Sequence, residues 1–189
     1  MTESTAIQSC LKHRDPLGFE YLVKKYRREA YMHAMIFMGN AEDAADACQE
    51  SFARAFEAFS RLQTLDAFYP WFYRILKNCC LNMLSRKKTS DRYRRQNIFH
   101  EMEEETPSSL YEKQDEKVRI WDVLYKLPLN HREILIMKYI KECRYDEISV
   151  LLEIPRGTVM SRLYHARKAF REAYESITAE TQPSKEMIK

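Results

Sequence analysis

The strongest constraint on the fold is a long amphipathic segment, residues 16–38, with helix signals at both ends. Asp15 stands where a helix N-cap is expected, and Pro16 falls in the first turn, where its missing N–H is tolerated. Gly39 follows the segment, at the place of a left-handed C-terminal residue. The chain has 3 glycines in 189 residues and is 31% charged. This balance favours a helical protein over a turn-rich β sandwich.

Two further helices are predicted before residue 89. Asn40 can cap the first, whose apolar residues step by three and four positions along one face: Ala45, Cys48, Phe52, Ala55 and Phe59. Its opposite face carries Asp43, Asp46, Glu50 and Glu57. After a short loop, a helix is predicted over residues 68–88, with Trp71, Ile75, Cys79 and Met83 on its buried side. The same phase directs Tyr73, Arg74 and Lys77 away from the core.

Residues 89–114 contain charge blocks, Pro107 and paired serines with little apolar periodicity, which predicts a flexible linker. Four helical segments follow, interrupted at Pro128, with approximate bounds 113–125, 130–141, 145–152 and 158–176. Residues 178–189 are predicted to form a loose tail. We therefore predict an all-α chain with two small helical domains, residues 1–88 and 115–177.

Bulk composition limits the function without naming it. A net charge of +3 is too small to establish a nucleic-acid partner, because that requires cations clustered on one face. The cysteines form no C-x-x-C motif, which predicts reduced thiols and no zinc site: Cys10, Cys48, Cys79, Cys80 and Cys143. Without a signal sequence or a long apolar run, a cytoplasmic protein is expected. Catalytic residues, metal ligands and cofactors are not expected.

The segment from Ile154 to Phe170, IPRGTVMSRLYHARKAF, has the form of a helix-turn-helix. Periodicity packs Val159, Leu163, Ala166 and Phe170 against Ile148, Leu151 and Ile154. Ser161, Tyr164, His165 and Lys168 then face outward, flanked by Met160, Arg162, Arg167 and Arg171. In such motifs the second helix enters the major groove. A merely solvated charged face has the same periodicity, but Pro155 and Gly157 at the turn favour DNA binding.

We divide this face into phosphate anchors and base readers. The predicted anchors are Arg156, Arg162, Arg167 and Lys168, and the predicted readers are Thr158, Met160, Ser161 and His165.

These residues carry a family resemblance. Residues 127–172 resemble the fourth conserved region of bacterial RNA polymerase sigma factors of the extracytoplasmic-function (ECF) class. Residues 19–62 and 68–88 resemble their second region. The resemblance implies a non-catalytic factor, monomeric when free, that binds core RNA polymerase and directs promoter-specific initiation. The second region would dock on the β′ clamp helices and melt the −10 element, and the fourth would bind the β flap and read the −35 element. An anti-sigma partner is also implied.

The resemblance assigns further residues to these tasks. DAADACQESF matches the polymerase-docking motif, whose polar positions are Asp43, Asp46, Gln49, Glu50 and Arg54. The loop that captures a flipped −10 base falls on residues 62–68, with Gln63, Thr64 and Asp66 as polar contacts. A solubilising face and a plain connecting loop are the respective alternatives. Single-stranded DNA would meet Tyr73, Arg74, Lys77 and Asn78, and its phosphates would meet Arg86, Lys87, Lys88, Arg92, Arg94 and Arg95.

Some features depart from the family or stay open. Glu153 stands where members commonly have Gly, which predicts a strained or a rearranged turn. Met160 and His165 stand where members often carry Lys or Arg, so the −35 preference is expected to be altered. Trp71 suits core packing or DNA contact, and adjacent Cys79 and Cys80 suit packing or redox sensing.

Two other classes of protein remain as rivals. A stand-alone helix-turn-helix regulator would dimerise on half-sites. A nucleic-acid-processing enzyme would need a phosphate-binding Gly loop or a carboxylate cluster, and the first half of the chain shows neither.

Overall fold

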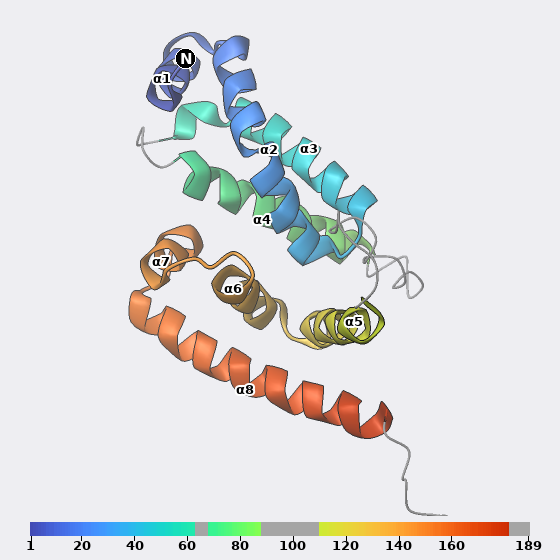
Figure 1. Ribbon diagram of the computed structural model, residues 1–189. Coiled ribbons are helices and arrows are strands. Elements are labelled where there is room, and N and C mark those ends of the chain that lie inside the picture. The colour runs from blue at the N-terminus through green and yellow to red at the C-terminus, as the bar shows by residue number, and fades with distance from the viewer. Residues whose placement is uncertain (63–67, 88–109, 182–189) are drawn as a thin grey trace, which may run out of the picture. The chain divides into compact units, whose positions relative to one another are not determined.

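The computed structural model describes residues 1–62, 68–87 and 110–181. Its regular elements in these ranges are helices, which confirms the all-α prediction, and the chain divides into two compact units (Figure 1). One unit contains α1 (Glu3–His13), α2 (Pro16–Met38), α3 (Ala41–Glu57), the short 3-10 helix η1 (Phe59–Arg61) and α4 (Phe68–Lys87). The other contains α5 (Leu110–Lys126), α6 (Leu129–Tyr139) and α8 (Arg156–Thr181). The short helix α7 (Tyr145–Leu152) precedes α8.

The caps predicted at both ends of α2 and at the start of α3 are confirmed. The Asp15 carboxylate accepts a hydrogen bond from the Leu17 N–H at 3.0 Å, and Gly39 is left-handed with a φ of 74°. Asn40 then caps α3, because its side-chain oxygen accepts from the Asp43 N–H at 2.9 Å. These contacts satisfy N–H groups that have no partner within a helix, so the chain turns sharply between α2 and α3.

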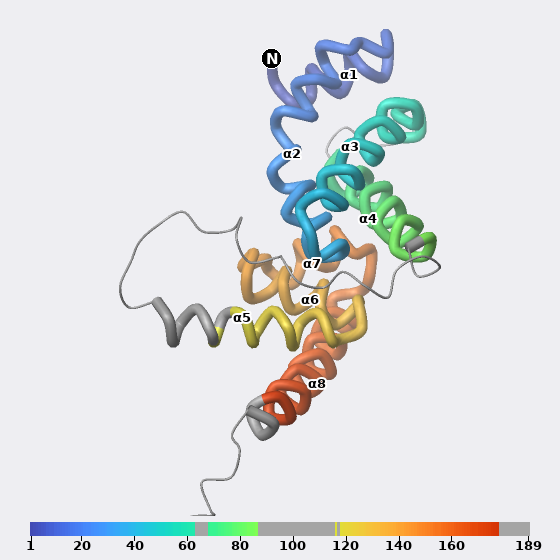
Figure 2. Tube along the Cα trace, turned by 90° about the vertical axis from the view of Figure 1, so that its right-hand side faces the viewer, coloured from blue at the N-terminus to red at the C-terminus, as the bar shows by residue number. Residues whose placement is uncertain are grey.

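The N-terminal helix α1 was not expected from the sequence. It lies at the N-terminal end of α2 (Figure 2), with Ala6, Ile7 and Cys10 buried. Gly18 permits this close approach, because a Cβ there would lie 2.9 Å from the Ala6 carbonyl oxygen and 3.1 Å from the Cys10 sulfur. A side chain at this position would therefore push α1 away from α2.

An aromatic core holds α2, α3 and α4 together. Phe52 of α3 stacks on Phe72 of α4 with ring centroids 4.3 Å apart, and Phe19 of α2 lies 4.9 Å from Phe56. Such rings bury large apolar areas and add a favourable stacking geometry. The described core of this unit is therefore built from rings contributed by all three helices.

The predicted buried faces of α3 and α4 need correction. Ala45 is exposed, and the apolar face of α3 is instead shifted to Ala44, Ala47, Cys48, Ser51, Phe52 and Ala55. In α4 the predicted Trp71, Ile75 and Met83 are only half-buried. Its fully buried side chains are Phe68, Phe72, Tyr73, Leu76, Cys79 and Cys80. The reason is that α4 packs against both α2 and α3, so its buried arc is wider than a single stripe.

In the second unit, two helices extend into segments that were predicted to be linker and tail. Helix α5 begins at Leu110, inside the expected linker, and α8 continues to Thr181, into the expected tail. The buried Arg132 of α6 ends α5: its guanidinium donates to the carbonyl oxygens of Leu124 at 3.0 Å and Tyr125 at 2.7 Å. It also lies 4.5 Å from the Tyr125 ring centroid. A charged side chain thus satisfies carbonyls that an isolated helix would leave unpaired.

The turn between α7 and α8 is strained rather than rearranged. Glu153 has a φ of 52°, in the left-handed region that favours glycine. Two hydrogen bonds close the turn around it: Ile154 N–H donates to the Ser149 carbonyl at 3.1 Å, and the Ser149 hydroxyl donates to the Ile154 carbonyl at 2.6 Å. The local bonds compensate for the missing glycine, and α8 begins immediately after Pro155.

Candidate functional site

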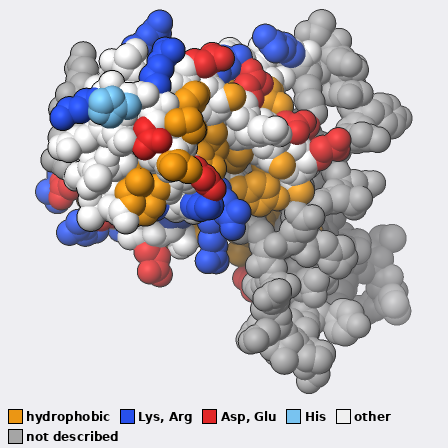
Figure 3. All heavy atoms as spheres, turned by 90° about the horizontal axis from the view of Figure 1, so that it is seen from above, with side chains coloured by type: hydrophobic (Ala, Val, Ile, Leu, Met, Phe, Trp, Pro, Cys, Tyr) orange, Lys and Arg blue, Asp and Glu red, His pale blue; other side chains and the backbone are white. Residues whose placement is uncertain are grey.

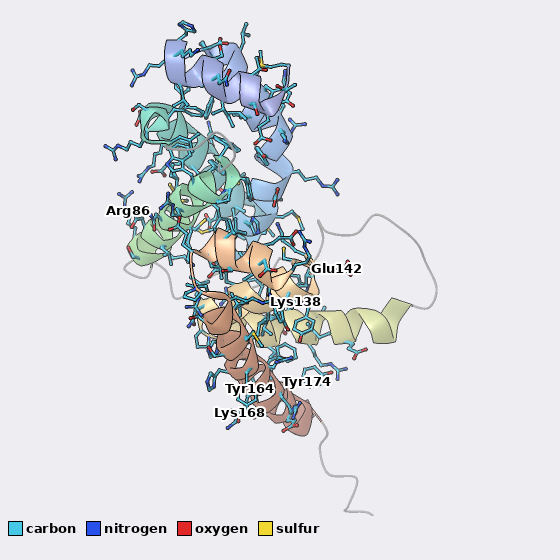
Figure 4. All side chains as sticks on the ribbon, turned by 90° about the vertical axis from the view of Figure 1, so that its left-hand side faces the viewer. Arg86, Lys138, Glu142, Tyr164, Lys168 and Tyr174 are labelled. Atoms are coloured by element: carbon cyan, nitrogen blue, oxygen red, sulfur yellow. The ribbon has the colours of Figure 1, made fainter. Side chains whose placement is uncertain are left out.

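The outward face of α8 agrees with the predicted helix-turn-helix. Val159, Leu163 and Ala166 are buried, whereas Phe170 is only half-buried. The opposite side is exposed along about three turns, at Met160, Ser161, Tyr164, His165, Lys168 and Arg171. Figure 4 shows Tyr164 and Lys168 next to each other along α8. The first turns of α8 therefore present a continuous exposed surface of the kind that enters a major groove.

The cations of α8 have different surroundings. Arg156 pairs with Asp146 of α7 at 3.4 Å, and Lys168 pairs with Glu172 at 3.9 Å. All four side chains are more than half exposed, so these pairs are weak and can exchange for a phosphate. Arg162 is half-buried.

Arg167, also a predicted phosphate anchor, is exposed. Its guanidinium donates to the Tyr139 hydroxyl of α6 at 3.4 Å. The sequence placed it on the flank of the outward face of α8, but periodicity could not reveal the partner on α6.

Arg167 also lines an apolar groove that the sequence did not predict. The groove has a volume of about 470 Å³ and lies among α5, α6 and α8. Its lining is mainly aliphatic and aromatic, and its edge carries Tyr139 and Ile140, which are 57% and 44% exposed. Two guanidinium groups, of Arg167 and Arg171, complete the wall. Exposed apolar walls of this kind suit a partner helix with an apolar side.

The predicted docking residues on the polar face of α3 differ in how exposed they are and in what they contact. Asp46 and Gln49 are exposed, and Glu50 forms an ion pair with Arg54 one turn later. The Asp43 carboxylate accepts from the Asn40 side-chain amide at 2.6 Å and therefore belongs to the helix cap. Asp46 and Glu50 are the acids best placed to meet a basic partner.

Tyr73 is wrong as a single-strand contact. It is 1% exposed, and its ring packs edge-on to His33, with centroids 4.8 Å apart. Arg74 and Asn78 are exposed on α4 and Lys77 is half-buried, as expected for a DNA-facing side. Arg86 is also exposed, near the end of α4 (Figure 4). Trp71 is half-buried against Phe59 and Phe68, at centroid distances of 5.9 and 6.0 Å, so it packs on the core while keeping some surface.

The remaining predicted −10 residues cannot be placed. Gln63, Thr64, Asp66, Lys88, Arg92, Arg94 and Arg95 lie outside the described residues. Lys87 ends α4, but its side chain is likewise outside them.

Comparison with known families decides the identity of the two units. Residues 22–90 match the family model for Sigma-70 region 2, and residues 117–170 match the model for Sigma-70, region 4. The chain belongs to the sigma-70 family. It is a promoter-specificity factor that acts in transcription initiation by RNA polymerase.

Curated relatives place this sigma factor in the ECF class. It is 29% identical over 176 residues to the ECF RNA polymerase sigma factor SigW of Bacillus subtilis, covering 86% of this chain and 91% of the relative. It is 28% identical over 175 residues to the RNA polymerase sigma-H factor of Pseudomonas aeruginosa, covering 88% and 91%. These alignments extend through both units.

Solved structures share its fold. The structure of CnrH in complex with the cytosolic domain of CnrY matches with a TM-score of 0.66 and 19% identity, covering 92% of this sigma factor and 97% of that chain. The sigma factor RpoE of Bartonella quintana, in complex with the anti-sigma factor NepR, matches with a TM-score of 0.63 and 16% identity, covering 83% and 96%.

The cysteines of this sigma factor favour packing over redox sensing. Cys79 and Cys80 are buried on α4, and burial raises the pKa of the Cys80 thiol to about 12. Burial likewise raises the pKa of Cys48 to about 12. A thiol with such a pKa is protonated at neutral pH, and the thiolate is the reactive form.

Two other properties of the molecule bear on its function. No helix in the described ranges 1–62, 68–87 and 110–181 is long and apolar enough to cross a membrane. The face of the molecule in Figure 3 mixes acidic and basic side chains around a group of apolar ones, rather than displaying one sign of charge.

Proposed function

We propose that this sigma factor docks on core RNA polymerase with α3 and contacts promoter DNA with α4 and α8. The separation of charge between helices supports this division most strongly. Asp46 and Glu50 lie on α3, whereas residues 156–171 of α8 contain five cations and no acid. The two helices therefore attract partners of opposite charge.

Docking on polymerase is assigned to the α3 face of Asp46, Gln49, Glu50 and Arg54. A helix with one acidic side fits beside a basic helix such as those of the β′ clamp. Arg54 forms an ion pair with Glu50 one turn earlier, so both side chains lie on the same face of the helix. Asp43 contributes by its hydrogen bond to the capping residue Asn40 and by its charge at the helix start.

Melting of the −10 element is assigned to α4 and the loop before it. Arg74, Lys77 and Asn78 would hold the separated strand, and Arg86 would meet phosphate. Gln63, Thr64 and Asp66 would contact a flipped base, which offsets the cost of unstacking it. Tyr73 is excluded from this set because it is buried.

The −35 element is assigned to the outward face of α8. Thr158, Met160, Ser161 and His165 would read base edges, while Arg156, Arg162, Arg167 and Lys168 would hold phosphates. Arg167 and Arg171 also line the groove among α5, α6 and α8. That groove is our candidate for the β flap, because its apolar lining suits the apolar side of a short helix.

The cellular location, the absence of catalysis and a further protein partner are proposed from these assignments. A protein that serves RNA polymerase works in the cytoplasm and leaves the nucleotide chemistry to the polymerase, so we assign it no catalysis and no cofactor. An anti-sigma protein is also proposed as a partner, since one of the solved structures with this fold is a sigma factor bound to an anti-sigma factor. Such a partner would cover the α3 face or the groove.

The test is in vitro transcription from genomic fragments with purified core polymerase, with and without the protein. We expect new promoter-dependent transcripts and a complex with core. If neither forms, the proposal is wrong. A dimer that binds half-sites tightly without core would favour the rival regulator.

A further inference from the structure

Two large apolar side chains stand exposed on the α8 face that we assign to the −35 element. Met160 is 53% exposed and Tyr164 is 61% exposed. They are four residues apart, so they lie on the same side of the helix, one turn from each other. Neither faces the core formed by Val159, Leu163 and Ala166.

The neighbours of this pair argue for a nucleic-acid partner rather than a protein. Lys168 continues the same exposed surface, as Figure 4 shows beside Tyr164, and no acid occurs between residues 156 and 171. An apolar protein surface brought here would have to approach cations whose ion pairs are exposed and weak. DNA suits both the cations and the apolar pair, because its phosphates are anionic and its major groove contains the apolar methyl groups of thymine.

Local contacts limit the other roles these positions could have. The Ser161 hydroxyl donates to the Thr158 carbonyl at 3.1 Å, so its hydrogen is used within the helix. The Tyr164 ring packs edge-on to His165, with centroids 5.3 Å apart, which restricts the directions the ring can take. The exposed surface therefore offers fewer free hydrogen-bond donors to a base than its sequence implies.

We propose that Met160 and Tyr164 form a thymine-reading patch, in which both side chains contact the C5-methyl groups of T·A pairs in the −35 element. The inference rests on the proposed function and adds the base that this face selects. Thymine alone presents a methyl group in the major groove of unmodified DNA.

The spacing of the patch matches neighbouring base pairs. Four helical residues rise by about 6 Å, and successive bases on a strand are about 3.4 Å apart. The patch thus spans roughly two base steps, so it selects two thymines close together. Each methyl group taken out of water would raise affinity about fourfold.

Replacing thymine with deoxyuridine tests the patch directly, because it removes the methyl group and keeps base pairing. Reconstituted holoenzyme would be titrated onto a promoter found in the transcription assay, with each −35 thymine replaced in turn. We expect about fourfold weaker binding at two positions and no change elsewhere. Met160→Ala and Tyr164→Ala should each lose sensitivity at one position. Leu17→Ala, which truncates an apolar residue that is 67% exposed on α2, is the matched control.

The possible results distinguish a failure of the thymine-reading patch from a failure of the proposed function. If transposing the −35 bases abolishes promoter binding but deoxyuridine changes nothing, the thymine-reading patch is refuted and the proposed function stands. If Met160→Ala or Tyr164→Ala weakens the complex with core, the pair is a protein contact and the inference is again refuted. If no −35 sequence affects binding, the proposed use of α8 has failed as well.

Discussion

Reversing the acidic charges of α3 should detach this protein from polymerase without unfolding it. The variant is Asp46→Lys with Glu50→Lys. Coulomb's law gives about 0.7 kcal/mol between unit charges about 6 Å apart in water. Reversal replaces an attraction by an equal repulsion, which costs about 1.4 kcal/mol for each residue, or roughly tenfold in affinity. The double variant should therefore bind core about 100-fold more weakly, and by more where the interface excludes water.

The effect on folding is much smaller. Glu50→Lys removes the ion pair with Arg54, a surface pair worth about 0.3 to 0.5 kcal/mol. Glu20→Lys on α2 removes the pair with Lys24, which has the same spacing, and so provides a matched control away from the docking face. Circular dichroism melting should show little change for any of these variants.

Binding to labelled core polymerase would be followed by fluorescence anisotropy at two salt concentrations. The loss should shrink at high salt, because exposed charges are screened within a Debye length. Should the folded double variant bind within twofold of the wild type, α3 does not dock through these acids. An equal loss in Glu20→Lys would show that the effect is not specific to the face.

Three further outcomes are expected. Arg132→Met removes the side chain that caps α5 and should destabilise the second unit by about 3 kcal/mol. Urea unfolding would be followed by the fluorescence of Trp121 in a Trp71→Phe background. An unchanged unfolding midpoint would contradict the capping role. Tyr73→Phe should leave holoenzyme binding to a single-stranded −10 oligonucleotide unchanged, whereas Arg74→Ala should weaken it and reduce the salt slope by about one. Burial, aided by His165 and Arg162, lowers the pKa of His131 below its ordinary value. The unfolded chain therefore gains this proton first, so stability should fall as pH drops below about 6.5, and His131→Gln should flatten that dependence.

Helix limits were largely predictable because their signals act within one turn. Asp15, Gly39 and Asn40 satisfy nearby backbone groups or adopt a local conformation, and α2 and α3 begin and end accordingly. The α8 face was predictable for a related reason: a single stripe, with Val159 and Leu163 buried, fixes the phase of the opposite side. For Glu153, the sequence left two possible turns, and its φ of 52° selected the strained one.

Sites that depend on several neighbours were not predictable in this way. The sequence by itself determined where most helices start and stop, which face of α8 is polar, and the family resemblance. Only the tertiary structure decided that Tyr73 is buried, because α4 packs on two helices at once. It also directed Arg167 to Tyr139 and formed the groove among α5, α6 and α8. Periodicity describes one helix and its solvent, whereas burial is set by how many other helices surround it.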